Sequence, residues 1–180
     1  MKIENIEVRD IASQFGTPVY VYSLEILRVS IAEIKKLAPV TRYAMKANSN
    51  VRILKEMLDN GVKIDAVSIF EIQRALRAGF KTDDICFTSD VFFNDDDVTF
   101  CLENNIYCNC GTLGMVAEYG KALKTTGAGS PKISIRINPG EGVGHSKKTN
   151  TGGPYSKRVT RTLASGNSPA AILASSVEMM

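Results

Sequence analysis

Apolar residues follow two alternating spacings along this chain, one typical of short buried strands and one typical of amphipathic helices. Short apolar runs predict five strands, over 40–46, 63–68, 85–89, 106–110 and 133–138. After each of the first four, apolar residues recur every three or four positions, which predicts a helix. Strands that alternate with helices of this length predict βαβ units and a parallel sheet, that is, an α/β fold.

The N-terminal segment predicts three further elements. A first helix is expected to end at Gly16, a plausible C-cap. Residues 18–22 predict a strand, and residues 24–34 have the apolar spacing of a second helix. Farther along, Ser68 with Glu71 three residues later forms a capping-box pattern, which predicts a helix start.

Two closures of the parallel sheet are open: a doubly wound sheet or a barrel. No G-x-G-x-x-G follows any predicted strand, so the sequence lacks the dinucleotide-binding fingerprint. A complete eight-fold barrel takes about 250 residues, and this chain has 180 residues. We therefore expect part of a TIM-type (β/α)8 barrel, with about five βα units.

Composition excludes several classes of function. The net charge is +3, and basic residues are spread among acids, so no nucleic-acid partner is indicated. No apolar run is long enough to span a membrane, and the N-terminus lacks the features of a signal peptide, so we expect a cytoplasmic protein. The four cysteines lie in apolar stretches without zinc-ligand spacing, which predicts buried free thiols and no metal site.

Charged residues inside the strands mark candidate chemistry. In the first barrel strand, Ala44 and Lys46 share one face, opposite the bulky pair at 43 and 45. If that pair faces the helices, Lys46 points into the barrel at the C-terminal end of the strand, where barrel enzymes place their chemistry. Asp65 and Arg136 interrupt other apolar strands in the same way. The alternative is that Lys46 is simply solvated and that Arg136 snorkels.

A long glycine-rich segment follows the fifth strand. It runs from 138 to 154, contains the single histidine, His145, and carries Lys147 and Lys148. Loops of this length are often lids or binding loops, although a plain surface loop is an equal alternative.

Several of these segments resemble the PLP-dependent decarboxylases of the alanine-racemase fold, which act on diaminopimelate, ornithine or arginine. The stretch 43–50 (YAMKANSN) resembles their cofactor-lysine motif, and 64–80 resembles the next block. The stretches 136–140 (RINPG) and 144–153 (GHSKKTNTGG) resemble segments particular to the bacterial diaminopimelate decarboxylases. The resemblance runs from about Ile11 to Lys157.

The resemblance implies a cofactor, a reaction and roles for individual residues. Pyridoxal 5'-phosphate (PLP) would form a Schiff base with Lys46, while Asp65 and Arg136 would line its pocket and Ala44 would pack beside the ring. Residues of the glycine-rich loop would close over the substrate; they are His145, Ser146, Thr149 and Asn150. The implied reaction converts meso-diaminopimelate to L-lysine and carbon dioxide, and the implied assembly is a homodimer.

The resemblance stops after Lys157, where Arg158 and the following residues depart from the family pattern. We expect residues 1–157 to be the N-terminal part of the PLP-binding barrel domain and residues 158–180 to be a non-homologous, disordered tail. On this interpretation the C-terminal β-domain of the family is absent, through truncation or a frameshift. The alternatives are an inactive fragment of this ancestry, or an ornithine or arginine decarboxylase or amino-acid racemase of the same fold.

Overall fold

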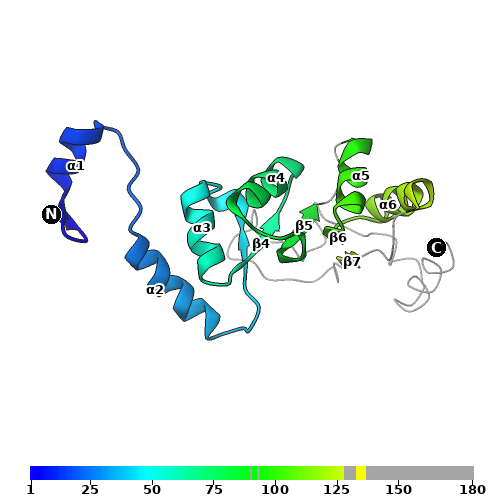
Figure 1. Ribbon diagram of the computed structural model, residues 1–180, viewed down its shortest axis with the longest axis horizontal. Coiled ribbons are helices and arrows are strands. Elements are labelled where there is room, and N and C mark those ends of the chain that lie inside the picture. The colour runs from blue at the N-terminus through cyan, green and yellow to red at the C-terminus, as the bar shows by residue number, and fades with distance from the viewer. Residues whose placement is uncertain (90, 93, 128–132, 137–180) are drawn as a thin grey trace, which may run out of the picture.

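The computed structural model describes residues 1–89, 91–92, 94–127 and 133–136 (Figure 1). In chain order the elements are β1 (Lys2–Ile3), β2 (Ile6–Glu7), α1 (Val8–Phe15), α2 (Leu24–Lys35), β3 (Arg42–Ala44), η1 (Met45–Ala47), α3 (Val51–Asp59), β4 (Lys63–Ala66), α4 (Ile69–Ala78), η2 (Thr82–Asp84), β5 (Ile85–Ser89), α5 (Asp95–Glu103), β6 (Tyr107–Cys110), α6 (Leu113–Thr126) and β7 (Ile133–Ile135). Here α, β and η denote α-helices, strands and short 3-10 helices.

The main sheet has five parallel strands whose spatial order, β3-β4-β5-β6-β7, is also their order in the chain. A doubly wound sheet reverses its strand order at a switch point, and no reversal occurs among these five strands. Continuous winding in one direction is the topology of the (β/α)8 barrel. The chain thus contains five strands of a TIM-type barrel, and the prediction of a partial barrel is confirmed.

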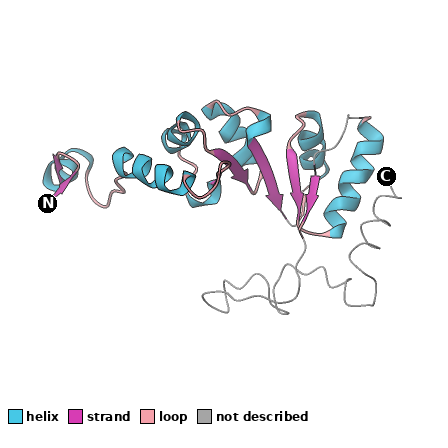
Figure 2. Cartoon of the chain, turned by 90° about the horizontal axis from the view of Figure 1, so that it is seen from below, coloured by secondary structure: helices cyan, strands magenta, loops and turns pink. Residues whose placement is uncertain are grey.

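Helices and strands bury one continuous apolar core between them (Figure 2). The strands contribute alternate residues, which include Ile64, Ala66, Ile85, Phe87, Cys108 and Cys110. The helices contribute apolar stripes, which include Leu54, Ile72, Cys101, Met115 and Tyr119. The Phe92 ring stacks against Phe87 at 5.7 Å and against Tyr119 at 6.3 Å between ring centroids.

Polar side chains fix where several barrel helices begin. The Ser68 hydroxyl accepts a hydrogen bond from the Glu71 N–H, and the Glu71 carboxylate accepts one from the Val67 N–H, so the predicted capping box is confirmed in this form. At the starts of α5 and α6, the side chains of Asn94 and Thr112 accept hydrogen bonds from the N–H groups of Asp97 and Met115. Helix α4 ends at Gly79, whose φ of +105° lies in the region that favours glycine.

The N-terminal segment differs from the sequence-based expectation. Residues 18–22 do not form the predicted strand, because no described strand lies beside them to complete a ladder; they connect α1 to α2, and Tyr20 is 90% exposed. A short antiparallel hairpin, β1 with β2, was not predicted. The two helices on either side of residues 18–22 were predicted correctly, and Gly16 follows α1 as its C-cap.

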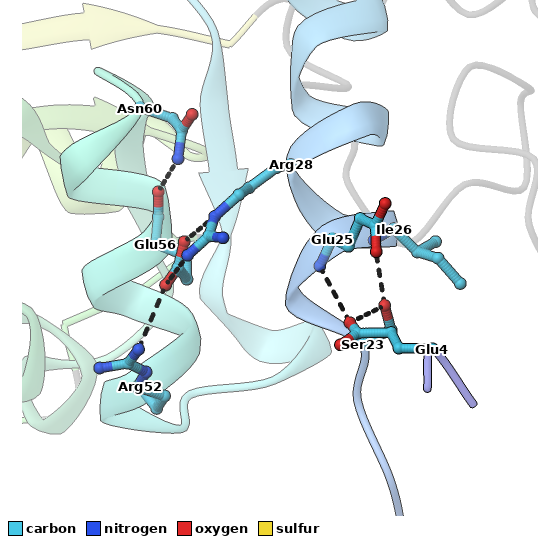
Figure 3. Close-up of polar contacts among 8 residues, drawn as sticks. All are labelled: Glu4, Ser23, Glu25, Ile26, Arg28, Arg52, Glu56 and Asn60. Carbon is cyan, nitrogen blue, oxygen red and sulfur yellow. Dashed lines mark hydrogen bonds and ion pairs between the residues drawn. The ribbon is translucent and has the colours of Figure 1, made fainter. Parts of the chain in front are cut away.

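Helix α2 is attached to the barrel by a buried carboxylate rather than by a broad apolar face. Ile31 is its one fully buried residue. Glu56 of α3 accepts hydrogen bonds from Arg28 Nε at 2.8 Å and from Arg28 Nη2 at 2.9 Å, and Arg52 lies 3.6 Å from the same carboxylate (Figure 3). The hydrogen bonds from Arg28 hold the pKa of Glu56 below its ordinary value.

None of the described helices is long and apolar enough to cross a membrane.

We predict that Glu56→Gln lowers the melting temperature of the protein at neutral pH. The folded-state pKa of Glu56 is below its ordinary value of 4.5, so the carboxylate stabilises the fold above that pH. This contribution is lost as the pH falls through the folded-state value. Thermal unfolding monitored by circular dichroism from pH 7 to pH 3 should therefore show the two melting temperatures converging in acid.

The matched control is Glu33→Gln. Glu33 lies on α2, the helix that carries Arg28, and pairs with Lys36 on the exposed surface. It should change the melting temperature little at any pH. Equal effects of the two substitutions at pH 7 would contradict the role given to Glu56.

Candidate cofactor site

Lys46 lies just beyond the C-terminal end of strand β3. The strand ends at Ala44 rather than at residue 46, and Lys46 occupies the middle of the 3-10 turn η1. Its neighbour Met45 is completely buried in the core, whereas Lys46 is exposed. The apolar anchor at Met45 thus fixes the backbone beside a free primary amine.

Hydrogen bonds hold the turn after Lys46. The Tyr43 hydroxyl donates to the Asn48 carbonyl oxygen at 3.0 Å, and the Asn50 N–H donates to Asn48 Oδ1 at 2.9 Å. Arg74 Nη1 of α4 donates to Ser49 Oγ at 2.7 Å. Burial raises the pKa of Tyr43, so its hydroxyl stays protonated and remains a donor at neutral pH. These contacts also explain why β3 stops early, since the chain turns toward α3 at this point.

The sheet face opposite the core carries polar residues, as the alternation of side chains predicts. Asp65 pairs in register with Ala44 and is half-buried, while its neighbours Ile64 and Ala66 are buried in the core. Thr88 of β5 donates a hydrogen bond to Asp65 Oδ1 at 2.5 Å. Among the described residues, no lysine or arginine forms an ion pair with Asp65.

A second polar pair lies beside the first. Asn109 is in register with both Thr88 and Ser134, and the Ser134 hydroxyl donates to Asn109 Oδ1 at 3.0 Å. Arg136 follows β7 and is half-buried, and its N–H donates to the Cys110 carbonyl oxygen at 2.9 Å. Side-chain alternation puts Arg136 on the same face as Ser134.

Basic residues near the opposite end of the strands are already satisfied. Lys63 Nζ lies 3.0 Å from Asp84 Oδ1. Arg42 Nη1 donates to the carbonyl oxygens of Ile64 and Asp84 at 3.2 and 3.1 Å. Lys46, by contrast, makes no hydrogen bond or ion pair within the described part of the chain. It is therefore a basic group at this sheet that is available to a ligand.

All four cysteines are buried and free, as predicted. Burial raises the pKa of Cys86 and raises that of Cys110 to about 12. The pKa of Cys108 is also raised, by contact with the Cys101 thiol and by burial. No metal-binding group of histidine, cysteine or carboxylate side chains occurs within the described residues.

Some predicted site residues lie outside the described residues. These are the loop residues His145, Ser146, Thr149 and Asn150, together with the expected tail 158–180. Conversely, sequence reasoning missed Thr88 and Asn109. Both could have been found from strand alternation. Thr88 lies two residues after Cys86, on the same face of its strand, and Asn109 lies between the buried Cys108 and Cys110.

The exposed Lys46 amine thus lies where barrel enzymes place their active sites, at the C-terminal end of a strand. Residues 25–164 match the family described as pyridoxal-dependent decarboxylase, pyridoxal binding domain. The chain therefore belongs to this family, which implies pyridoxal phosphate as the cofactor. The match extends seven residues past the end expected from the sequence motifs.

Similar proteins include several diaminopimelate decarboxylases. The chain is 44% identical over 153 residues to that of Escherichia coli and 43% identical over 150 residues to that of Streptomyces coelicolor. These alignments cover 81% of this chain in both cases, and 34% and 32% of the two relatives. The chain thus spans about a third of the curated relatives that it matches.

Solved structures give the same result for the fold. A crystal structure of diaminopimelate decarboxylase has a TM-score of 0.75 and 36% identity, covering 94% of this chain and 38% of that one. The enzyme from Helicobacter pylori, solved with L-lysine, has a TM-score of 0.77 and 29% identity, covering 84% and 39%. An arginine decarboxylase of Paramecium bursaria Chlorella virus, 24% identical with a TM-score of 0.62, shares the fold.

The residues present fit the cofactor that the family implies. The aldehyde of PLP needs a primary amine, and Lys46 supplies one that is exposed and unpaired among the described residues. Ala44, two residues earlier in the chain, adds only a methyl group to the inner face. Asp65 is half-buried and hydrogen-bonded, so it offers a fixed acceptor on the same face.

We predict that the native protein resists thiol modification. With 5,5'-dithiobis(2-nitrobenzoate) at pH 8, none of the four cysteines should react within minutes, because burial excludes the reagent and raised pKa values keep Cys86, Cys108 and Cys110 protonated. All four should react after denaturation in guanidinium chloride. Rapid reaction of any thiol in the folded protein would contradict the burial described above.

Proposed function

We propose that this chain belongs to a diaminopimelate decarboxylase, which removes one carboxylate from meso-diaminopimelate to give L-lysine and carbon dioxide. Relatives of that name are 40–44% identical across about four-fifths of the chain. The Helicobacter pylori enzyme was solved with L-lysine, the product of the proposed reaction. The stretch 144–153 resembles a segment particular to this branch of the family.

In this proposal, Lys46 holds the cofactor through its amine. Support comes from its position beyond β3 and from the lack of a competing partner among the described residues. Bound PLP supplies an electron sink for the pair left behind when carbon dioxide departs. Asp65 and Ala44 line the cofactor pocket. Arg136 adds a fixed positive charge, which suits an anionic group of cofactor or substrate.

The glycine-rich loop is proposed to close over the substrate, with contacts from His145, Ser146, Thr149 and Asn150. The support is the sequence alone: a long segment rich in glycine and polar residues follows β7. Closure of such a loop excludes water from the reacting groups.

We further propose that the enzyme works in the cytoplasm as a homodimer. Four buried free cysteines are typical of a reducing compartment. The dimer is inferred from the family resemblance.

A second candidate function for these 180 residues alone is cofactor binding without decarboxylation. The observation that favours it is the coverage of about a third of the relatives' length. The residues proposed for the described part of the site lie on or directly after strands of the five-stranded sheet β3 to β7.

The observation that carries the proposal is the exposed Lys46 amine two residues after Ala44, which is in register with the half-buried Asp65, and labelling of Lys46 tests it. We expect incubation with PLP, reduction with borohydride and peptide mapping to place the label on Lys46 in preference to other lysines. Lys46→Arg should remove most of the label. Lys63 is the internal control, because its amine is paired with Asp84.

An assay of carbon dioxide release separates the two candidate functions. Release from meso-diaminopimelate but not from L-ornithine or L-arginine supports the decarboxylase. Selective label on Lys46 without release supports cofactor binding alone. Label scattered over many lysines, or none at all, would contradict both.

A further inference from the structure

Thr88 makes the one side-chain hydrogen bond to Asp65 within the described part of the chain. Its hydroxyl lies 2.5 Å from Asp65 Oδ1. An ionised carboxylate can only accept, so the threonine hydroxyl must donate. A hydrogen bond to a charged acceptor is among the stronger ones in proteins. The contact joins β4 to β5 on the polar face of the sheet, on the side away from the helices.

Thr88 is itself held in place from the other side. Cys86 Sγ lies 3.7 Å from Thr88 Oγ1 on the same strand and the same face. Since the threonine hydrogen is committed to Asp65, the thiol is the donor in this second contact. The result is a directed chain from Cys86 through Thr88 to Asp65, which restrains the Thr88 hydroxyl and one oxygen of the Asp65 carboxylate.

The second oxygen of Asp65 is left for a ligand. Within the described residues, Oδ2 has no hydrogen-bond partner, and Ala44, the register neighbour on β3, is too small to cover it. Lys46 follows Ala44 by two residues. We propose that Thr88 is a positioning residue: it fixes the Asp65 carboxylate so that Oδ2 is presented to the cofactor held by Lys46. This inference rests on the proposed function.

Removal of the Thr88 hydroxyl tests the role. Thr88→Val keeps the shape of the side chain and loses the donor, and we expect it to weaken PLP binding by up to about tenfold, because the released Asp65 side chain must then be ordered when the cofactor binds. Thr88→Ser restores the hydroxyl and should bind within about twofold of the native chain on the same reasoning. PLP affinity is measured by absorbance titration, and labelling of Lys46 by reduction and peptide mapping.

A matched control and a second background make the test specific. The Ser134 hydroxyl donates to Asn109 on the same face and makes no hydrogen bond to Asp65. Ser134→Ala should therefore leave PLP affinity unchanged. If Thr88 acts through Asp65, Thr88→Val should have little further effect in an Asp65→Ala background. Thermal unfolding of each variant checks the fold, and Thr88→Ala serves as a second hydroxyl-free variant should valine disturb the packing.

The outcomes distinguish this inference from the proposed function. Native-like PLP affinity in folded Thr88→Val and Thr88→Ala would overturn the positioning role while Lys46 labelling still supports the cofactor site. An equal loss in the Asp65→Ala background would also overturn it, because Thr88 would then act independently of Asp65. If the native chain shows no selective label on Lys46, the proposed function and this inference both fail.

Discussion

The five parallel strands bury one face under helices and present a polar face on the other side. Parallel sheets are normally covered on both faces, and their strands are then apolar throughout. In β4 and β6 the side chains instead alternate: Ile64 and Ala66 are buried while Asp65 between them is half-buried, and Cys108 and Cys110 are buried on either side of Asn109. This alternation determines both the core and the candidate site, because successive side chains of a strand point to the helix-covered face and to the polar face in turn.

The same constraint explains how the Lys46 amine can be accessible while its backbone is held in place. Met45 is completely buried, so its side chain anchors the turn to the core. The Tyr43 hydroxyl and Asn48 then close that turn with hydrogen bonds. The backbone of Lys46 is therefore held in a defined position although its side chain is exposed. An amine in a loop without such an anchor would lose more conformational entropy each time it bound a ligand.

How much of this arrangement could be predicted depends on how local the determining interaction is. The helix starting at Ser68 was predictable because its cap lies within a few residues of sequence. Asp65 could be found from alternation within its strand, whereas Lys46 lies in the turn after β3, where that alternation does not apply. The pairing of Asp65 with Thr88 spans 23 residues and depends on register between strands, which no local pattern reports. Residues 18–22 have strand-like composition, yet a strand also needs a neighbour.

Helix α2 shows how a charged contact can add to apolar packing at the border of such a fold. Other apolar residues of this helix are exposed, with Ile26, Val29 and Ile34 at 65%, 60% and 52% exposure. Ile31 is the one buried residue of the helix and Leu27 packs partly buried against the core, so the contact between the Glu56 carboxylate and the Arg28 guanidinium adds to a small apolar contact in positioning the helix. A bidentate pair is directional where apolar packing is not. It therefore fixes the orientation of α2 on α3. The chain passes from α2 into β3 and the lysine turn.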